Sequence, residues 1–248
     1  MPEPVALAAP APAALPPPPP APPPPTPIGE FQITFYYIIH EAEMAAPAND
    51  NALADSEDQS LAAMGPLTPP ADLVPLRAQD CTPLAHVTKA FAGQVAMQGT
   101  GRLRDGRMVN VATGCKCGRP CFHVLQRHRT WGTGGSGRAL VPFRSVAVDP
   151  KVIPMGSLLY LPALDGVRMP GPPGVGAFIH DGCVVAVDTG GGIQGQQLDL
   201  FVGRRAYYKG LARRGGSHAW SKHAEVWDGA GRCQQEGGKV RRASPGAS

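Results

Sequence analysis

The sequence predicts a mainly β fold, most simply a small β-barrel, on two observations. Glycine and proline are abundant, with 31 and 29 copies in 248 residues, whereas charged residues make up 17% and aromatic residues 6% of the chain. That composition disfavours a helical bundle and favours short strands joined by many turns. The second observation is a series of short apolar runs, each ended by Gly or Pro, which supply the strands.

Each predicted strand follows from its own pattern. FQITFYYII is rich in aromatic and β-branched residues, whereas SVAVDP and SLLYLP alternate and stop at proline. HVTKAFAGQVAM, 86–97, fits either one strand or a short helix, and helices are also expected near 52–63 and 204–212. The predicted strands are 31–39, 107–112, 145–150, 157–162, two strands around a turn within 177–191, 197–203 and 223–229.

Composition divides the chain into three parts. Residues 1–28 are rich in Pro and Ala, lack the regions of a signal peptide, and are expected to form a disordered linker. Residues 29–230 form the predicted β domain, with an irregular insertion at 41–85 and a cysteine-bearing loop at 113–140. Residues 231–248 are basic and polar and are expected to be a disordered tail. No run approaches the eighteen apolar residues of a spanning helix.

Basic residues are concentrated in the later part of the chain. No Lys or Arg precedes Arg77, whereas nine of the 19 acidic residues do, so the remainder carries 23 bases against ten acids. Such a surface suits an anionic partner, such as nucleic acid, anionic lipid or an anionic glycan. A solvated basic face with no partner is an equally good explanation.

Six cysteines in a Gly- and Pro-rich chain indicate disulfides and an oxidising compartment. The cluster CKCGRPCFH could instead bind zinc with His123, but its spacing differs from the usual structural zinc sites. We therefore favour disulfides, whose pairing the sequence leaves open. The candidates are Cys81, Cys115, Cys117, Cys121 and Cys183.

Three aspartates share one setting, flanked by apolar residues on a predicted strand: Asp149, Asp188 and Asp199. A carboxyl in apolar surroundings has a raised pKa and can hold a proton near neutral pH. Cleavage of a glycosidic bond needs a general acid of this kind. Alternatively, Asp149 and Asp188 cap turns. That alternative is weak for Asp199, since no turn residue follows it before Gly203.

The glycines between Asp188 and Asp199 match the G-x-G-x-x-G pattern of dinucleotide-binding loops. That pattern requires a helix to follow, whereas QQLDLFV alternates like a strand. We therefore interpret the glycines as a turn that presents Asp188 and Asp199 to one groove.

These segments resemble a known domain. AVDPKVIPMGSLLYLP followed by AVDTGGGIQGQQLDLFVG is similar to the 3D (three-aspartate) domain of the membrane-bound lytic transglycosylase A family and of secreted cell-wall proteins. EVWDG is similar to the strand that closes the transglycosylase domain. Within AVDTGGGIQG, one position departs from the family pattern, since Gly192 stands where the family usually has Ala. The matching positions are 149, 150, 154, 156, 186, 188, 190, 191, 193, 195 and 199.

The resemblance implies a six-stranded double-psi β-barrel that cleaves peptidoglycan glycan strands in cell-wall turnover, as a lytic transglycosylase or an O-glycosyl hydrolase. It implies Asp199 as the acid/base, with Asp188 and Asp149 as supporting catalytic residues and no cofactor or metal. We expect a monomer of the cell envelope, periplasmic, outer-membrane-associated or secreted, with peptidoglycan and not nucleic acid as partner. The substrate-binding candidates are Gly190, Gly191, Gln194 and His180.

Three points stay open at this stage. For His180, a loop or core position is favoured over a substrate-binding one. The family has a second large domain forming the other wall of its glycan groove, and residues 41–140 show no pattern that predicts one. A non-catalytic peptidoglycan-binding module, or a disulfide-stapled structural protein, are therefore the alternative functions.

Overall fold

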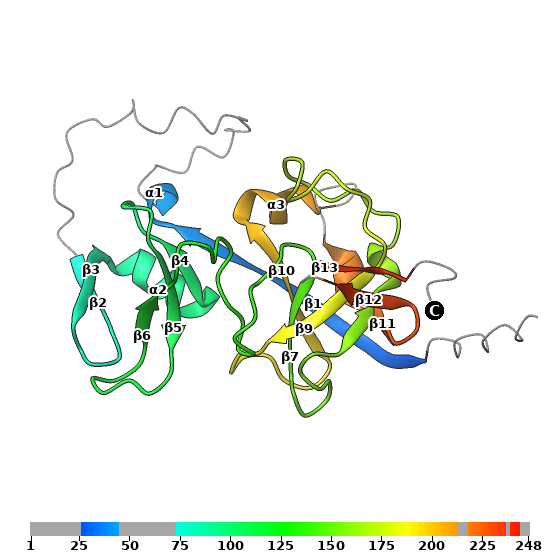
Figure 1. The fold of residues 1–248 in the computed structure, drawn as a ribbon, viewed down its shortest axis with the longest axis horizontal. Helices are drawn as coiled ribbons and strands as arrows, with labels where there is room; N and C mark the ends of the chain where they lie inside the picture. The colour runs from blue at the N-terminus through cyan, green and yellow to red at the C-terminus, as the bar shows by residue number, and fades with distance from the viewer. Residues whose placement is uncertain (1–25, 45–72, 213–217, 237–238, 244–248) are drawn as a thin grey trace, which may run out of the picture.

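The structure is a computed structural model of the chain and describes residues 26–44, 73–212, 218–236 and 239–243. Most of the predicted N-terminal linker and the helix expected near 52–63 lie outside these ranges. The fold is mainly β, as predicted, and two lobes lie side by side with one long strand running through both (Figure 1).

The elements are short apart from that strand. The strands are β1 (Pro27–His40), β2 (Leu73–Arg77), β3 (Pro83–Thr88), β4 (Thr100–Arg102), β5 (Met108–Ala112), β6 (Cys121–Val124), β7 (Ser145–Val148), β8 (Leu158–Tyr160), β9 (Cys183–Asp188), β10 (Gln197–Arg204), β11 (Ala224–Asp228), β12 (Cys233–Glu236) and β13 (Lys239–Arg242). The helices are α1 (Glu41–Met44), α2 (Lys89–Gln98) and α3 (Arg205–Gly210), with 3₁₀ turns at Pro162–Leu164 and Ala219–Ser221.

One sheet runs through the molecule in the order β10-β7-β9-β8-β11-β1-β4-β5-β6. Strand β1 also pairs in parallel with β10, so the six strands β1, β10, β7, β9, β8 and β11 pair in a closed ring. We call residues 26–36, 141–212, 218–236 and 239–243, which build this ring, the ring lobe. We call residues 37–44 and 73–124 the second lobe, and residues 125–140 the bridging loop.

Strand β1 joins the lobes because different parts of it have different partners. Its start pairs with β11, its middle with β10, and its last residues, Ile39 and His40, with β4. The pairing with β10 contains a bulge at Tyr36/Tyr37, opposite Gly203. Gly203 has φ +83°, and a Cβ there would lie 3.0 Å from Pro142 Cγ, so glycine is needed at this bulge.

The ring lobe packs around one apolar core. Side chains alternate across a strand, so one face of each ring strand faces this core and the other faces outward. The outward face is covered by the bridging loop and the C-terminal hairpin, β12 and β13. The core residues are Phe31, Ile33, Phe143, Val146, Val148, Ile153, Leu159, Leu161, Leu164, Met169, Val184, Ala186, Leu198, Leu200, Val202, Leu211, Ala224 and Val226.

The second lobe corrects the expectation that residues 41–140 are irregular. Residues 73–124 form five strands and helix α2, which Thr88 caps by accepting a hydrogen bond from Phe91 N at 3.2 Å. The ambiguous stretch 86–97 is therefore the end of a strand followed by a helix. The lobe has its own small core: Ile39, Leu76, Val87, Phe91, Val95, Leu103, Val109 and Phe122.

All six cysteines are disulfide-bonded, which confirms the disulfide prediction over the zinc alternative. Cys81 pairs with Cys117 and Cys115 with Cys121, both in the second lobe. Cys183 pairs with Cys233, the one cysteine missing from the candidates. The expectation of a disordered tail from residue 231 is wrong for residues 231–236 and 239–243, because this bond and Arg242, which contacts Asp165 and Asp181, anchor β12 and β13.

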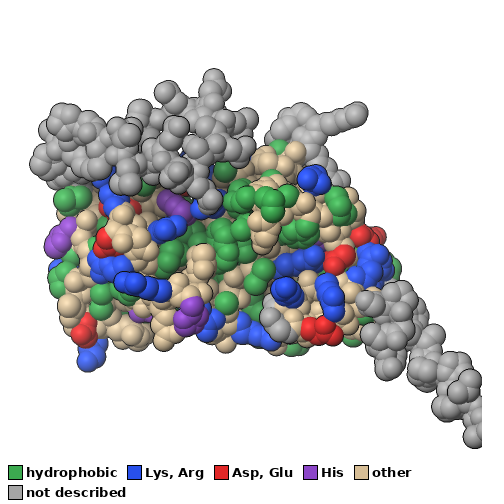
Figure 2. All heavy atoms as spheres, turned by 45° about the horizontal axis from the view of Figure 1, so that its top comes forward, with side chains coloured by type: hydrophobic (Ala, Val, Ile, Leu, Met, Phe, Trp, Pro, Cys, Tyr) green, Lys and Arg blue, Asp and Glu red, His purple; other side chains and the backbone are tan. Residues whose placement is uncertain are grey.

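Most other predicted strands are confirmed within a few residues. Two corrections remain: β1 begins at Pro27, inside the predicted linker, and no strand forms over 177–182, where the chain makes only a bridge from Ile179 to Arg168. None of the helices in the described ranges has the length and apolarity that a membrane crossing needs. Lys and Arg side chains outnumber Asp and Glu on the face in Figure 2, in keeping with the net charge of +4.

Candidate functional site

Two of the three predicted aspartates lie on the same outward face of the ring. Ala147 of β7 pairs with Asp199 of β10 on one side and with Asp188 of β9 on the other. Directly paired residues of neighbouring strands point to the same face of a sheet. Val187, which precedes Asp188, also packs on this face because the β7–β9 pairing has a bulge there. The bulge therefore turns Asp188 outward beside Asp199.

Asp199 has fewer hydrogen-bond partners than Asp149 and Asp188. Its Oδ1 atom is buried and has no hydrogen-bond partner among the residues described. Burial raises the pKa of Asp199 to about 6, and the charge of Asp188 contributes to the rise, while the hydroxyl of Thr34, its neighbour on β1, opposes it. Asp199 is therefore about half protonated at pH 6 and still protonated in about a tenth of the molecules at pH 7, so it can act as a general acid in mildly acidic to neutral solution.

Asp188, in contrast, accepts three hydrogen bonds. Its Oδ1 accepts from Gly135 N at 2.7 Å and from Thr189 N at 2.8 Å, and its Oδ2 accepts from the Tyr36 hydroxyl at 2.8 Å. Burial, followed by the charge and hydrogen bond of Asp188, raises the pKa of Tyr36, so Tyr36 stays a donor. These three donors fix the orientation of the Asp188 side chain.

The backbone of the bridging loop can approach Asp188 closely because the residues at the contact, Gly134 and Gly135, have no side chain. A Cβ on Gly134 would lie 2.4 Å from Val187 O, and one on Gly135 would lie 2.9 Å from Thr189 Cγ2. Glycine at both positions lets the loop backbone approach β9 closely enough for Gly135 to donate to the carboxylate.

Asp149 has a different role. Its Oδ1 accepts from Lys151 N at 3.0 Å and its Oδ2 from Gly195 N at 2.9 Å. These two backbone bonds hold the pKa of Asp149 below its usual value. Asp149 thus caps a turn, as the alternative interpretation of the sequence proposed. Its bond to Gly195 also links the glycine-rich loop before β10 to the end of β7. Asp149 therefore positions the loop, and the structure gives it no bond to Asp188 or Asp199.

Gly190, Gly191 and Gln194 lie on the exposed loop between β9 and β10. The amide of Gln194 donates to Gly191 O at 3.4 Å, and β10 follows the loop, in agreement with the predicted strand. The loop borders the aspartates, and the substrate-binding role of these three residues stays a prediction.

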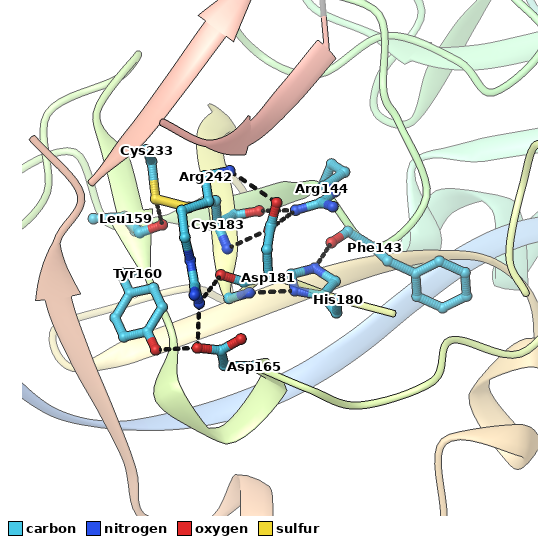
Figure 3. Close-up of polar contacts among 11 residues, drawn as sticks. Phe143, Arg144, Leu159, Tyr160, Asp165, His180, Asp181, Cys183, Cys233 and Arg242 are labelled. Atoms are coloured by element: carbon cyan, nitrogen blue, oxygen red, sulfur yellow. Dashed lines mark hydrogen bonds and ion pairs between the residues drawn. A yellow bond between two sulfur atoms is a disulfide. The ribbon is translucent and has the colours of Figure 1, made fainter. Parts of the chain in front are cut away.

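His180 occupies a core position, as the alternative from the sequence has it, and is too buried for the expected substrate-binding role. Its side chain is 1% exposed. Its Nε2 lies 2.7 Å from Phe143 O and its Nδ1 accepts from Gly182 N at 2.9 Å, so both ring nitrogens are used (Figure 3). Burial and the nearby Arg144 charge lower the pKa of His180 to about 4.

Sequence analysis missed Thr34 and Tyr36, which bring β1 into the site. Both lie on the outward face of β1 at alternate positions of FQITFYYII. Their alternation was visible, but the parallel register that sets Thr34 opposite Asp199 joins segments far apart in the chain. No local signal specifies that register.

A groove of about 550 Å³ runs along β1 beside Thr34, between the two lobes. Its walls come from the ring lobe, from helix α3 and from Gln98 at the end of α2. Aromatic rings gather here, with Tyr208 and His218 stacked at a centroid distance of 4.4 Å and Phe35 at 5.4 Å from Tyr208. Such a surface is suited to an extended ligand with flat apolar faces.

A family model, described as the 3D domain, matches residues 144–217. Residues 144–217 are a 3D domain. The 3D domain thus contains Asp149, Asp188 and Asp199, together with β7, β8, β9, β10 and α3. The chain outside it contributes β1, β11 and the bridging loop to the same site.

Several solved structures resemble this chain, all at TM-scores below 0.5. Escherichia coli MltA with bound chitohexaose has a TM-score of 0.45 at 16% identity, over 87% of this chain and 73% of that chain. A membrane-bound lytic murein transglycosylase of Agrobacterium tumefaciens has 0.43 at 14%, over 81% and 73%. LtgG, a lytic transglycosylase of Burkholderia pseudomallei, has 0.36 at 20%, over 80% and 70%. No curated protein matches the sequence.

Proposed function

We propose that this protein cleaves the glycan strands of peptidoglycan, with Asp199 as the single general acid/base. The observation that carries the proposal is the carboxyl of Asp199, which lies beside Asp188 and has a buried Oδ1 with no hydrogen-bond partner among the described residues and a pKa of about 6. The match of residues 144–217 to the 3D domain supports the proposal, because all three aspartates lie within it. On this proposal, the closed ring of six strands is the double-psi β-barrel that the resemblance implies.

The proposed reaction begins with transfer of the Asp199 proton to the glycosidic oxygen between N-acetylmuramic acid and N-acetylglucosamine. The C–O bond breaks, its electron pair leaves with the protonated oxygen, and positive charge develops at the anomeric carbon. The carboxylate of Asp188, held by its three donors, stabilises that charge. Because those donors occupy both oxygens of Asp188, it is a poor nucleophile, and no covalent glycosyl-enzyme is proposed.

In the second step the carboxylate of Asp199 takes a proton from the attacking hydroxyl. If that hydroxyl is the muramyl 6-hydroxyl, the product is a 1,6-anhydro end and the enzyme is a lytic transglycosylase. If it belongs to water, the product is a reducing end and the enzyme is a hydrolase. The groove beside β1, with Phe35, Tyr208 and His218, would hold the strand, and the second lobe contributes Tyr37 and Gln98 to its lining.

The same proposal implies a location. Three disulfides indicate an extracytoplasmic, oxidising compartment. We place the protein in the cell envelope, where peptidoglycan is its partner, and propose that it acts as a monomer.

The test is digestion of isolated sacculi by the full chain with its disulfides intact, followed by mass spectrometry of the released muropeptides. We expect Asp199→Asn to lower the rate by at least about 10³-fold, while Asp105→Asn, on an exposed turn of the second lobe, leaves it unchanged. Anhydro ends distinguish a transglycosylase from a hydrolase. If sacculi are bound but nothing is released between pH 4.5 and 8, the protein is a binding module and the catalytic proposal fails.

A further inference from the structure

A second groove, of about 550 Å³, lies on the outward face of the ring between the bridging loop and the C-terminal hairpin. Its floor is apolar, formed by Val185 and Val187 of β9 with Val240 of β13. Three arginines line it, Arg129, Arg138 and Arg144, and none of the lining residues is acidic. We call it the arginine groove.

Arg144 is held rigidly at one wall. Its side chain is 13% exposed, and its Nη1 contacts the Asp181 carboxylate and donates to Cys183 O at 2.7 Å (Figure 3). Asp181 also accepts from Cys183 N at 3.1 Å and from Arg242 N at 2.8 Å. These contacts link the arginine to the disulfide-anchored hairpin, so its position is set before any ligand binds.

The other two arginines remain available. Arg138 donates to the Gln235 side chain at 3.0 Å, a neutral partner that leaves its charge uncompensated. Arg129 makes no hydrogen bond or ion pair with the side chains that the structure describes. With the charge of Arg144 balanced by Asp181, two positive charges remain over an apolar floor, and such a surface attracts an anion that also carries alkyl groups.

The arginine groove lies next to the proposed catalytic site. The bridging loop separates them: Gly135 N donates to Asp188, Ser136 Oγ donates to Val187 O at 2.6 Å, and Gly137 lines the groove. Val187 itself directly precedes Asp188. A side branch of a strand bound at the aspartates therefore needs to cross only a few residues of loop to reach the arginines.

We propose that the arginine groove binds the free carboxylates of the peptide stems carried by the muramic acid residues. This inference rests on the proposed function, since it names the part of the same substrate that this second groove would hold. Guanidinium groups pair with carboxylates in a planar, two-bond geometry. The valine floor suits the methyl groups of alanine in the stem better than it suits a polymer of phosphodiesters.

The experiment measures peptide binding without cleavage. The probe is the synthetic stem tetrapeptide L-Ala-γ-D-Glu-L-Lys-D-Ala, which has two free carboxylates, titrated by calorimetry into the full chain carrying Asp199→Asn with its disulfides intact. We expect the analogue with both carboxylates amidated to bind at least about tenfold more weakly. Arg129→Gln and Arg138→Gln together should weaken binding of the free acid at least about tenfold. Arg127→Gln, an exposed arginine outside the groove, is the matched control and should leave the affinity unchanged.

A second readout connects the groove to turnover. In the otherwise wild-type chain, Arg129→Gln with Arg138→Gln should lower the preference for peptide-bearing strands over peptide-stripped strands, measured as a ratio of kcat/KM values. Equal binding of the acid and the amide, absence of binding, or a double variant that binds like its parent would overturn the inference. Preferential binding of polyglycerol phosphate would overturn it as well. Peptide binding without glycan cleavage would overturn the proposed function alone, and cleavage without peptide binding would overturn this inference alone.

Discussion

The two lobes are stabilised in different ways. The ring lobe buries eighteen apolar residues in one core, and its six strands pair in a closed ring that leaves no strand of the ring at a sheet edge. The second lobe buries eight residues in its core but contains two of the three disulfides. A small core supplies little stabilisation, and cross-links compensate by restricting the unfolded chain. The ring lobe is therefore stabilised by burial, and the second lobe depends on covalent bonds.

Removing one disulfide of similar loop length from each lobe should show most clearly that the two lobes are stabilised differently. Cys81–Cys117 and Cys183–Cys233 close loops of 36 and 50 residues, so each is expected to contribute about 4 kcal/mol through chain entropy. Cys81→Ser with Cys117→Ser should unfold the second lobe, whereas Cys183→Ser with Cys233→Ser should free the hairpin and leave the ring folded. Amide hydrogen exchange in β5 and β9 reports on each lobe. Equal exchange in both variants would contradict the comparison.

Each lobe has a histidine that resists protonation. Burial is the main cause that lowers the pKa of His180 in the ring lobe and of His40 in the second lobe to about 4, from 6.5. Because the unfolded chain binds these protons more readily, stability is complete above pH 6.5 and falls as the pH drops toward 4. Each histidine is expected to cost about 3 kcal/mol over that window.

Chemical denaturation at pH 7.5, 6, 5 and 4.5 measures this loss. His40→Gln should flatten the pH dependence of the second lobe, and His180→Gln that of the ring lobe. Exposed His86→Gln is the control. If the free energy of unfolding still falls with pH after both substitutions, other titrating groups cause the loss of stability.

The contact between the second lobe and the bridging loop can be tested at Asn110. Its Nδ2 donates to Thr133 O in the bridging loop at 2.8 Å, and its Oδ1 accepts from the Thr100 hydroxyl at 2.6 Å. Asn110→Ala leaves both partners without a bond, at a cost of about 2 kcal/mol. It should also loosen the loop that donates to Asp188 and so lower activity. Thr130→Ala, exposed in the same loop, should change neither stability nor activity in denaturation and sacculus assays.

In the ring lobe, burial disfavours the ionised form of the Asp199 carboxyl. Because the pKa of Asp199 is raised from 3.8 to about 6, the folded state holds this proton more tightly than the unfolded state, so stability falls as the pH rises from about 4 through 6. Asp199→Asn should therefore stabilise the protein at pH 7.5, by about 1 to 2 kcal/mol after allowance for solvent.

The gain from Asp199→Asn should disappear below pH 4, where both states of the wild type are protonated. Asp149→Asn is the opposite case, because backbone bonds hold the pKa of Asp149 low, and it should destabilise at neutral pH. A destabilised Asp199→Asn at pH 7.5 would mean that the carboxyl has a partner that compensates its burial.

The individual strands of the ring were predictable because their patterns are local, whereas the closure of the ring through β1 depends on distant partners. SVAVDP, SLLYLP and QLDLFVG each show alternation and a clear end, and Asp199 differed from Asp188 through the lack of a turn residue after it. In the second lobe the strand at 107–112 and the strand or helix at 86–97 were predicted, whereas the other strands were missed because they are short, with β4 only three residues long, and depend on distant partners. The same holds for Tyr36 and for the C-terminal hairpin, whose contacts join residues more than 60 positions apart.

Strand β1 has a consequence for the order of folding. It comes first among the described strands, but its partners are residues 101–102, 197–204 and 224–227. Neither lobe can complete its sheet from local contacts, and the ring cannot close until β11 is present. Such non-local pairing makes folding slow and leaves an apolar strand exposed in the meantime. We therefore expect a chain truncated before residue 224 to aggregate, although it retains every residue of the 3D domain.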